Sequence, residues 1–344
     1  DKFIGIVDID KVPETITSTA ISQTRWATHG GVTKENAHPH SDCKRETFIV
    51  HNGIISNHKE IRKELEEHGH TFKSQTDSET ISHFFEGKDV KENLPEFFNK
   101  FEGEFAVLLL RKGENKIYAF KRGSPLALGI MDNGFVLASD IYAFSDKTKK
   151  AIFFNEDEFA IITPDNYEFY KKDTTPTKKE ITEFKWEEKQ EDKNFDHYMI
   201  KEIKEIPKVS RRLLLSLKNE QKLEIEKISR MIKESKRVVF LASGSSYYAA
   251  LLGAQLLARA GIDAHAVISS EFRSFTIIDE NTLAIAVSQS GETMDVIEAL
   301  RGIKAKGAKI SSIINVPYST VQRMSLAHIN IEAGQEVCVA ATKT

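Results

Sequence analysis

The sequence predicts a mixed α/β protein in two parts, antiparallel strands first and a doubly wound parallel sheet second. Up to about residue 184, short apolar runs alternate with Gly, Asn and Asp, a pattern typical of hairpins. From residue 196 onward, apolar residues recur at helical spacing, and buried strands then alternate with helices. The 344 residues are enough for two separate hydrophobic cores.

The first part, residues 1–184, is expected to hold short strands and two helices. The strands are expected at 48–50, 105–110, 117–121, 126–130, 135–138 and 159–162. Helical patterns cover 59–68 and 77–85, and Asp77 or Ser78 could cap the second. A last hairpin is expected from 167–171 and 178–184. The charged residues 185–195 then form a plausible linker.

The second part, residues 196–344, opens with two helices, one with its apolar face running from Met199 to Leu217 and one over 223–234. Buried strands are expected at 237–242, 264–268, 282–287 and 308–314, with helices between them. Because strands that alternate with helices run parallel and are covered on both faces, this pattern predicts a doubly wound sheet.

Composition argues against several functional classes. A net charge of -3 gives no electrostatic case for nucleic-acid binding. No apolar run has the length of a membrane span, and no secretory signal is visible. Cys43 and Cys338 form no metal-ligand pattern and suit a reducing compartment, so we expect a cytoplasmic protein. No metal, nucleotide or other cofactor is implied.

Two serine-rich turns are the strongest signals in the second part. The turn at 288–293 (SQSGET) follows one buried strand, and the turn at 243–246 (SGSS) follows another. Each offers hydroxyls and backbone N–H groups at a helix N-terminus, a site suited to a dianion such as a sugar phosphate. The two turns are expected to form one pocket at the carboxyl edge of the sheet. For any single serine, the alternative is a helix cap.

Three polar clusters stand out in the first part. They are TRWATHG (24–30) with NAHPH (36–40), HNGIISNH (51–58) and TDSE (76–79). An Arg can hold a carboxylate by two parallel hydrogen bonds, and an Asp can hold an ammonium group. Together they could bind both charged groups of an α-amino acid. An Asn-Gly pair can present donors to an oxyanion, although the same pair is common in turns. A lone His is usually structural, and Trp26 is more often a core residue.

In this order and spacing, the three clusters resemble the glutaminase domain of the glutamine–fructose-6-phosphate aminotransferases, an N-terminal-nucleophile-type αββα sandwich. The segments SGSS, SSEFR, SQSGET and ATK resemble the first of the family's two sugar-isomerase (SIS) subdomains, and HYMIKEI (197–203) its junction helix. The resemblance covers nearly the whole chain. It implies transfer of the glutamine amide nitrogen to fructose 6-phosphate, with glucosamine 6-phosphate and glutamate as products, in a homodimer.

The resemblance also implies roles for single residues. Arg25 would bind the glutamine α-carboxylate, Asp77 its ammonium, and Asn52 with Gly53 would form the oxyanion hole. The rest of the glutamine pocket would comprise Trp26, Thr28, His29 and His38. The sugar phosphate would be held by Ser246, Ser288, Gln289, Ser290 and Thr293, with Ser245 close by and Val339 lining the sugar site.

Departures from the family pattern shape the expected activity. The family's nucleophile is an N-terminal cysteine, and the chain as given is expected to begin after it. The second sugar-isomerase subdomain, with its Schiff-base lysine, is also expected to be missing. Cys43 and Cys338 lie outside a nucleophile context, and Lys343 matches a non-catalytic position, so we expect binding elements only. The alternatives are a non-catalytic sugar-phosphate-binding regulator, disfavoured by the glutaminase motifs, and another amidotransferase, disfavoured by SQSGET.

Overall fold

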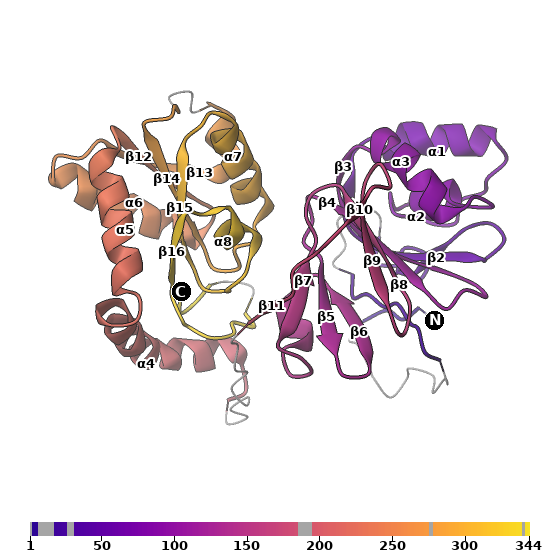
Figure 1. Cartoon of the computed structure of the whole chain (residues 1–344), viewed down its shortest axis with the longest axis horizontal. Helices are drawn as coiled ribbons and strands as arrows, with labels where there is room; N and C mark the ends of the chain where they lie inside the picture. Colours follow the sequence, from indigo (N-terminus) through magenta and orange to yellow (C-terminus); the bar gives the residue numbers. More distant parts are fainter. Residues whose placement is uncertain (1, 6–16, 26–30, 185–194, 275–277, 339–340) are drawn as a thin grey trace. The chain divides into compact units, whose positions relative to one another are not determined.

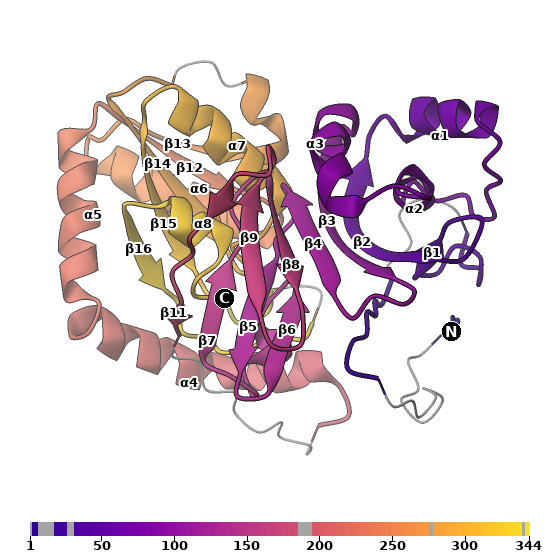
Figure 2. The same cartoon turned by 45° about the vertical axis from the view of Figure 1, so that its right-hand side comes forward.

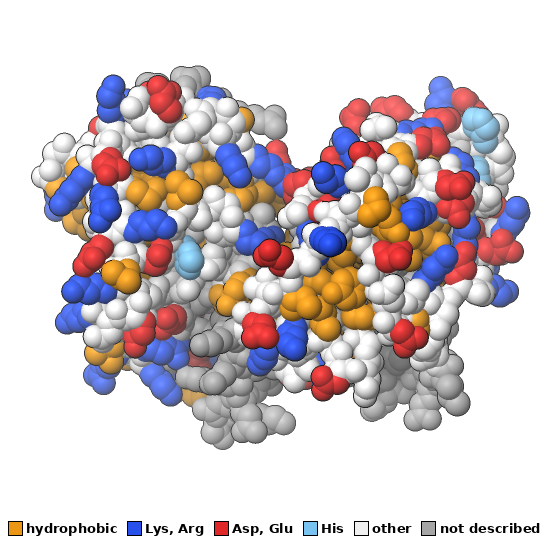
Figure 3. Space-filling model, in the orientation of Figure 1, with side chains coloured by type: hydrophobic (Ala, Val, Ile, Leu, Met, Phe, Trp, Pro, Cys, Tyr) orange, Lys and Arg blue, Asp and Glu red, His pale blue; other side chains and the backbone are white. Residues whose placement is uncertain are grey.

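The computed structural model describes residues 2–5, 17–25, 31–184, 195–274, 278–338 and 341–344. The chain divides into two compact units, residues 1–187 and 188–344 (Figure 1). On the face drawn in Figure 3, basic and acidic side chains are interspersed over each unit. Among the described residues, no helix combines the length and the apolar character needed to cross a membrane.

The first unit contains two antiparallel sheets. The larger has the order β1-β2-β3-β4-β8-β9-β10 and the smaller the order β11-β7-β5-β6. The strands are β1 (His40–Ser41), β2 (Thr47–Ile55), β3 (Gly103–Arg111), β4 (Ile117–Arg122), β5 (Ala127–Met131), β6 (Gly134–Ala138), β7 (Lys150–Phe153), β8 (Glu158–Ile162), β9 (Tyr167–Lys171), β10 (Pro176–Thr177) and β11 (Thr182–Glu183). The helices are α1 (His58–Glu67), α2 (Glu79–Phe84), α3 (Val90–Lys100) and the 3₁₀ helix η2 (Ile141–Phe144).

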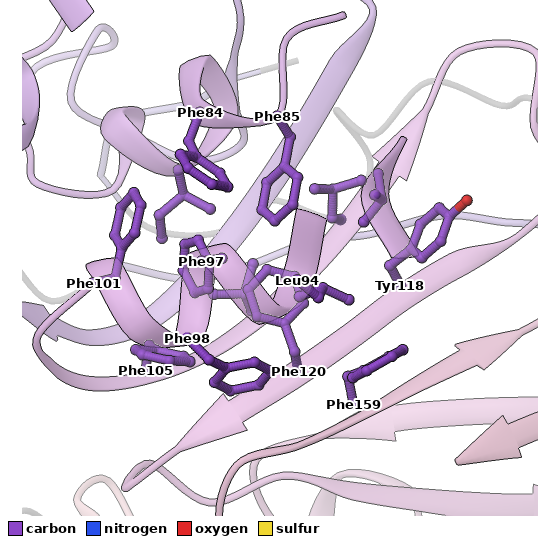
Figure 4. Packing of buried hydrophobic residues seen from close by; sticks show 14 of the residues in the cluster. Phe84, Phe85, Leu94, Phe97, Phe98, Phe101, Phe105, Tyr118, Phe120 and Phe159 are labelled. Atoms are coloured by element: carbon purple, nitrogen blue, oxygen red, sulfur yellow. The ribbon is translucent and has the colours of Figure 1, made fainter. Parts of the chain in front are cut away.

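Alternation along the larger sheet builds two cores. Phe105 and Phe120 face the helices and pack with Phe84 of α2 and Phe97 of α3, as Figure 4 shows. The intervening residues, such as Ala106, face the smaller sheet instead. Figure 2 shows the helices gathered beside β2 and β3. Among the described residues, η2 is the helical element beside the smaller sheet, so a full second helical layer is not seen there.

The second unit is built on one parallel sheet with the order β13-β12-β14-β15-β16. Its strands are β12 (Arg237–Ala242), β13 (Ala264–Ile268), β14 (Thr282–Ser288), β15 (Lys309–Ile314) and β16 (Ala327–Asn330). Its helices are α4 (Tyr198–Lys218), α5 (Lys222–Glu234), α6 (Ser245–Arg259), η3 (Ser269–Ser274), α7 (Met294–Ala305) and α8 (Thr320–Met324). Val239 and Leu241 of β12 pack with residues of α7, whereas Val238 and Phe240 pack with residues of α5 and α6. Figure 1 shows these helices beside the sheet. The predicted fold class is confirmed: antiparallel sheets in the first unit and a doubly wound parallel sheet in the second.

The structure corrects some expected elements. The hairpin expected from 167–171 and 178–184 is wrong, because β9 pairs with Pro176–Thr177 while β11 pairs with β7 in the other sheet. Helix α2 begins at Glu79, after Ser78, and has no side-chain cap. Helix α3 was not expected, because Pro95 interrupts its helical pattern. The expected linker, 185–195, lies outside the described residues except for its last residue.

Candidate functional site

Asn52 and Gly53 lie inside strand β2, opposite Ala106 and Phe105 of β3. The alternative that this pair forms a turn is therefore wrong. Gly53 has φ of +124°, and a Cβ there would lie 2.1 Å from the carbonyl oxygen of Glu104. Only glycine fits such a close approach of two strands at positive φ. The neighbouring side chain of Asn52 is exposed.

The side chain of Gln23 orients the amide of Asn52. Gln23 Nε2 donates to Asn52 Oδ1 at 2.6 Å and to the carbonyl oxygen of His51 at 2.8 Å. The His51 N–H donates back to Gln23 Oε1 at 3.2 Å. Because the acceptor oxygen of Asn52 is engaged, its Nδ2 group, the donor that an oxyanion needs, lies at the other end of the amide. Gln23 was not predicted from the sequence, since one Gln in a polar segment carries no signal.

The structure brings Asp77 to the strand that carries Asn52 and Gly53. Asp77 Oδ2 accepts a hydrogen bond from the Ile55 N–H at 2.8 Å, and Asp77 is 5% exposed. The neighbouring Ser78 Oγ lies 2.9 Å from Nδ1 of His51, the residue before Asn52. Burial lowers the pKa of His51, while the Asp77 charge acts in the opposite direction. A buried carboxylate beside β2 can attract an ammonium group.

His38 lies near this group as a neutral imidazole. Burial lowers the pKa of His38 to about 2, and the charges of His40, His51 and Arg25 add to the effect. Arg25 is partly exposed, and its Nη1 lies 3.5 Å from the carbonyl oxygen of Gly31. Four other predicted site residues, Trp26, Thr28, His29 and Val339, lie outside the described residues.

Buried hydrogen bonds hold the loops around Asp77. Asn36 and Gln75 are joined by a bond from the Gln75 N–H to Asn36 Oδ1 at 2.9 Å. The Glu79 carboxylate accepts from the N–H groups of Lys73 and Ser74 at 2.9 and 2.6 Å. Burial opposes the charge on Glu79, but the nearby His83, whose Nε2 lies 3.6 Å away, and hydrogen bonds from Ser74 and these amides outweigh burial and lower the pKa of Glu79 to about 2. The TDSE segment therefore contributes an internal anchor beside its candidate ligand-binding aspartate.

In the second unit, the two serine-rich turns follow adjacent strands. Strands β12 and β14 pair in parallel, with Ala242 opposite Val287, so both turns lie at the same edge. From β12 the chain passes through α6 to β13 at one side, and from β14 through α7 to β15 at the other. The two turns therefore flank the point where the winding of the sheet reverses. Ligands of open α/β sheets bind in the crevice at such a point.

Neither α6 nor α7, the helices that follow the two turns, is capped by a side chain. Helix α6 has Gly244 as its N-cap, with φ of +58°, and α7 has Thr293, which makes no cap hydrogen bond. The helix-cap alternative is thus not observed for Ser245, Ser246 or Thr293. Uncapped N–H groups and the positive end of each helix dipole can receive an anion.

The shape of the 288–293 turn is set by its own hydroxyls and by a neighbouring turn. Ser288 Oγ accepts from the Gly291 N–H at 3.0 Å, and Ser290 Oγ accepts from the Glu292 N–H at 3.1 Å. A Cβ on Gly291 would lie 2.0 Å from Ser319 Oγ. The Gln289 carbonyl accepts from the N–H groups of 315 and 316, directly after β15. The contact of Ser319 with this turn was not predicted, although the segment PYST (317–320) is also a serine-containing turn that follows a strand.

Cys338 and Lys343 have structural partners on α4. The carboxylate of Glu202 accepts from the Val337 and Cys338 N–H groups at 2.6 and 3.2 Å. Desolvation and the neighbouring Glu202 raise the pKa of the Cys338 thiol, which disfavours the nucleophilic thiolate. Lys343 Nζ lies 2.6 Å from Glu205 Oε2. Glu202 thus joins α4 to Val337 and Cys338, a contact that was not predicted from the sequence.

A cavity of about 540 Å³ lies between α6 and the edge strand β13. Its lining includes Tyr247, Gln255, His265 and Glu271, and none of the predicted phosphate-binding residues. Because no residue predicted to bind phosphate lines this cavity, we do not assign the cavity to the sugar phosphate.

Comparisons with known proteins agree with the division of the chain into two units. Residues 24–146 match a family model described as a glutamine amidotransferase domain, and residues 231–344 match one described as a SIS domain. The glutamine–fructose-6-phosphate aminotransferase [isomerizing] of Sulfurisphaera tokodaii is 40% identical over 94% of this chain and 56% of that protein. The protein of the same name from Thermotoga maritima is 39% identical over 94% of this chain and 55% of its own length.

Two solved structures share limited similarity with the chain. The C-terminal domain of glucosamine-fructose-6-phosphate aminotransferase from Francisella tularensis is 32% identical, covers 44% of each chain and has a TM-score of 0.40. The glutamine phosphoribosylpyrophosphate amidotransferase from B. subtilis is 16% identical, covers 91% of this chain and 72% of that chain, and has a TM-score of 0.40.

Fold, site and comparisons together define a chain that joins a glutamine amidotransferase domain to a SIS domain. By sequence it belongs to the family of the isomerising glutamine–fructose-6-phosphate aminotransferases, as the motifs predicted. The chain spans 56% of the length of the Sulfurisphaera tokodaii relative.

Proposed function

We propose that the full-length protein containing this chain transfers the amide nitrogen of glutamine to fructose 6-phosphate, giving glucosamine 6-phosphate and glutamate. The observation that carries the proposal is the presence, in one chain, of an amidotransferase domain and a SIS domain in the order found in relatives of that name. The amidotransferase part would cover 1–184, a linker 185–195 and the sugar part 196–344. The protein would act as a cytoplasmic homodimer.

Glutamine would bind beside β2. The Asp77 carboxylate would attract the substrate ammonium, and the Arg25 guanidinium would hold the α-carboxylate. The geometry of β2 supports this, because Asp77 is bonded to the same strand that carries Asn52 and Gly53. Charge developing on the amide oxygen would meet Asn52 Nδ2 and the Gly53 N–H. Trp26, Thr28, His29 and His38 would shape the rest of the pocket.

Fructose 6-phosphate would bind at the carboxyl edge of the parallel sheet. Its phosphate would lie between the start of α6, with Ser245 and Ser246, and the 288–293 turn. Ser288, Gln289, Ser290 and Thr293 would donate from that turn, and Val339 would line the sugar. The uncapped starts of α6 and α7 support this assignment.

The proposal is tested by incubating the full-length protein with amide-¹⁵N-glutamine and fructose 6-phosphate and following the label by NMR. We expect ¹⁵N in glucosamine 6-phosphate and one glutamate per amino sugar. Binding of fructose 6-phosphate without turnover would contradict the proposal and favour the regulator. Glutamine hydrolysis with no labelled amino sugar would contradict it and favour another amidotransferase.

A further inference from the structure

Four side chains from three segments of the first unit converge, and none of them is a predicted ligand-binding residue. Cys43 lies in the turn between β1 and β2, His70 follows α1, His83 lies in α2, and Glu86 follows α2. Their donor atoms, one from each residue, all lie within 4.8 Å of one another. They span 43 positions of sequence without a recognisable spacing, which explains why the two cysteines showed no metal-ligand pattern in the sequence.

Four of the six distances between the donor atoms are close to those of a tetrahedral site. Cys43 Sγ lies 3.6 Å from His83 Nδ1 and 3.9 Å from His70 Nδ1. Glu86 Oε2 lies 3.0 Å from His70 Nδ1 and 3.6 Å from His83 Nδ1. Tetrahedral zinc, with bonds of about 2.3 Å to sulfur and about 2.0 Å to nitrogen and oxygen, separates S and N donors by about 3.6 Å and N and O donors by about 3.3 Å. The four measured separations agree with these values to within about 0.4 Å.

The surroundings orient the donors as a metal site requires. The Thr71 N–H donates to Cys43 Sγ at 3.3 Å, which helps to hold the sulfur atom in place. Glu79 Oε1 lies 3.6 Å from Nε2 of His83, on the ring edge opposite Nδ1. A carboxylate on the far side of a ligating imidazole is common in metal sites, and its charge favours the tautomer that carries the proton on Nε2 and leaves Nδ1 free to bind a metal.

The ligand types point to Zn²⁺. A thiolate and two imidazoles favour zinc over Mg²⁺ or Ca²⁺, which prefer oxygen ligands. One thiolate and one carboxylate with two neutral imidazoles also balance the charge of a divalent ion. The His83 side chain is 1% exposed, whereas Cys43 is exposed, so the cluster has a buried base and an open entrance. Four protein ligands leave no open position, which is typical of a structural site.

We propose that Cys43, His70, His83 and Glu86 bind one structural Zn²⁺ ion. The ion would join the turn before β2 to the end of α2. The start of α2 follows Asp77, and β2 carries Asn52, so the ion would stabilise the two elements on which the candidate glutamine-binding groups lie. This inference does not depend on the proposed function.

The test uses the purified 344-residue chain. We expect one zinc per chain by elemental mass spectrometry after dialysis against metal-free buffer. Replacement by Co²⁺ should give the visible absorption of tetrahedral cobalt and a thiolate charge-transfer band. Cys43→Ser and Glu86→Gln should each lose at least 10-fold in zinc affinity. Cys338→Ser and His68→Asn, a matched thiol and a matched exposed histidine, should keep the affinity of the unchanged chain.

Stability provides a second readout that does not require activity. A chelator should lower the unfolding temperature of the unchanged chain and of Cys338→Ser, and leave that of Cys43→Ser unaltered. Less than about 0.1 zinc per chain with no cobalt spectrum would overturn the proposal. It would also be overturned if Cys43→Ser bound zinc as tightly as the unchanged chain, since the cluster would then not hold the ion.

Discussion

The carboxylate of Asp77 accepts a hydrogen bond from the backbone N–H of Ile55 at 2.8 Å. This bond joins the start of α2 to strand β2. Asn52 and Gly53 lie on the same strand, and the Asn52 amide is oriented by Gln23. The candidate ammonium-binding charge and the candidate oxyanion donors therefore belong to one hydrogen-bonded frame.

Asp77→Asn should weaken glutamine binding without unfolding the unit. The amide oxygen can still accept from the Ile55 N–H, but the charge that would hold the substrate ammonium is lost. A hydrogen bond to a charged group contributes about 1.5–3 kcal/mol, so affinity should fall about 10- to 100-fold. Calorimetric titration with glutamine measures this change. Asp132→Asn, in the exposed turn between β5 and β6, is the matched control, and equal losses in both variants would contradict the assignment.

Gly53→Ala should be much more destabilising than Gly69→Ala. Both glycines have positive φ, +124° and +91°, so both variants incur backbone strain of about 1–2 kcal/mol. Only at Gly53 does the added Cβ meet a backbone oxygen, at 2.1 Å, whereas nothing lies within 4 Å at Gly69. We expect a loss above about 3 kcal/mol for Gly53→Ala in urea unfolding. Similar losses of unfolding free energy in the two variants would show that the close approach of β2 and β3 at Gly53 does not exclude a Cβ atom.

Local patterns in the sequence were sufficient to predict most strands of both units. Apolar runs such as 117–121 and 237–242 reappear as β4 and β12, because alternation and β-branched residues act locally. Pairing partners could not be predicted in the same way. Strand β11 joins β7 in the smaller sheet rather than forming a hairpin with β9, since pairing depends on packing between distant segments.

The candidate sites show the same limit: local motifs could be predicted, but contacts between distant segments could not. The serine-rich turns follow strands, as expected, whereas Asn52 lies inside a strand longer than the expected 48–50 and Asp77 precedes α2 instead of belonging to it. The contacts of Gln23 and Glu202 were not predictable, because each joins positions far apart in sequence through a single side chain. The cluster around Cys43 is of the same kind, since its ligands come from three separate segments.

The first unit should lose stability as the pH falls below about 6.5, partly through His38. The folded-state pKa of His38 is about 2, below the ordinary value of about 6.5. The unfolded chain therefore binds one more proton between these values, so the stability contribution is complete above pH 6.5 and is lost as pH falls. One such group changes stability by about 1.4 kcal/mol per pH unit.

His38→Asn should reduce the slope of unfolding free energy against pH by about that amount between pH 6 and pH 4. His40, whose pKa burial lowers to about 3, remains in this variant and keeps part of the slope. Urea unfolding at several pH values measures the difference. The exposed His68→Asn serves as control, and an unchanged slope in His38→Asn would show that His38 is not held neutral in the folded unit.

The most direct test of the account compares the binding of fructose 6-phosphate and fructose to this chain by calorimetry. We expect the phosphosugar to bind at least 10-fold more tightly, because the phosphate would meet the starts of α6 and α7. Thr293→Val should weaken that binding about 10- to 100-fold, while Thr177→Val, on edge strand β10 of the other unit, should leave it unchanged. Equal affinity for the two sugars would contradict the claim that these serine-rich turns recognise a phosphate.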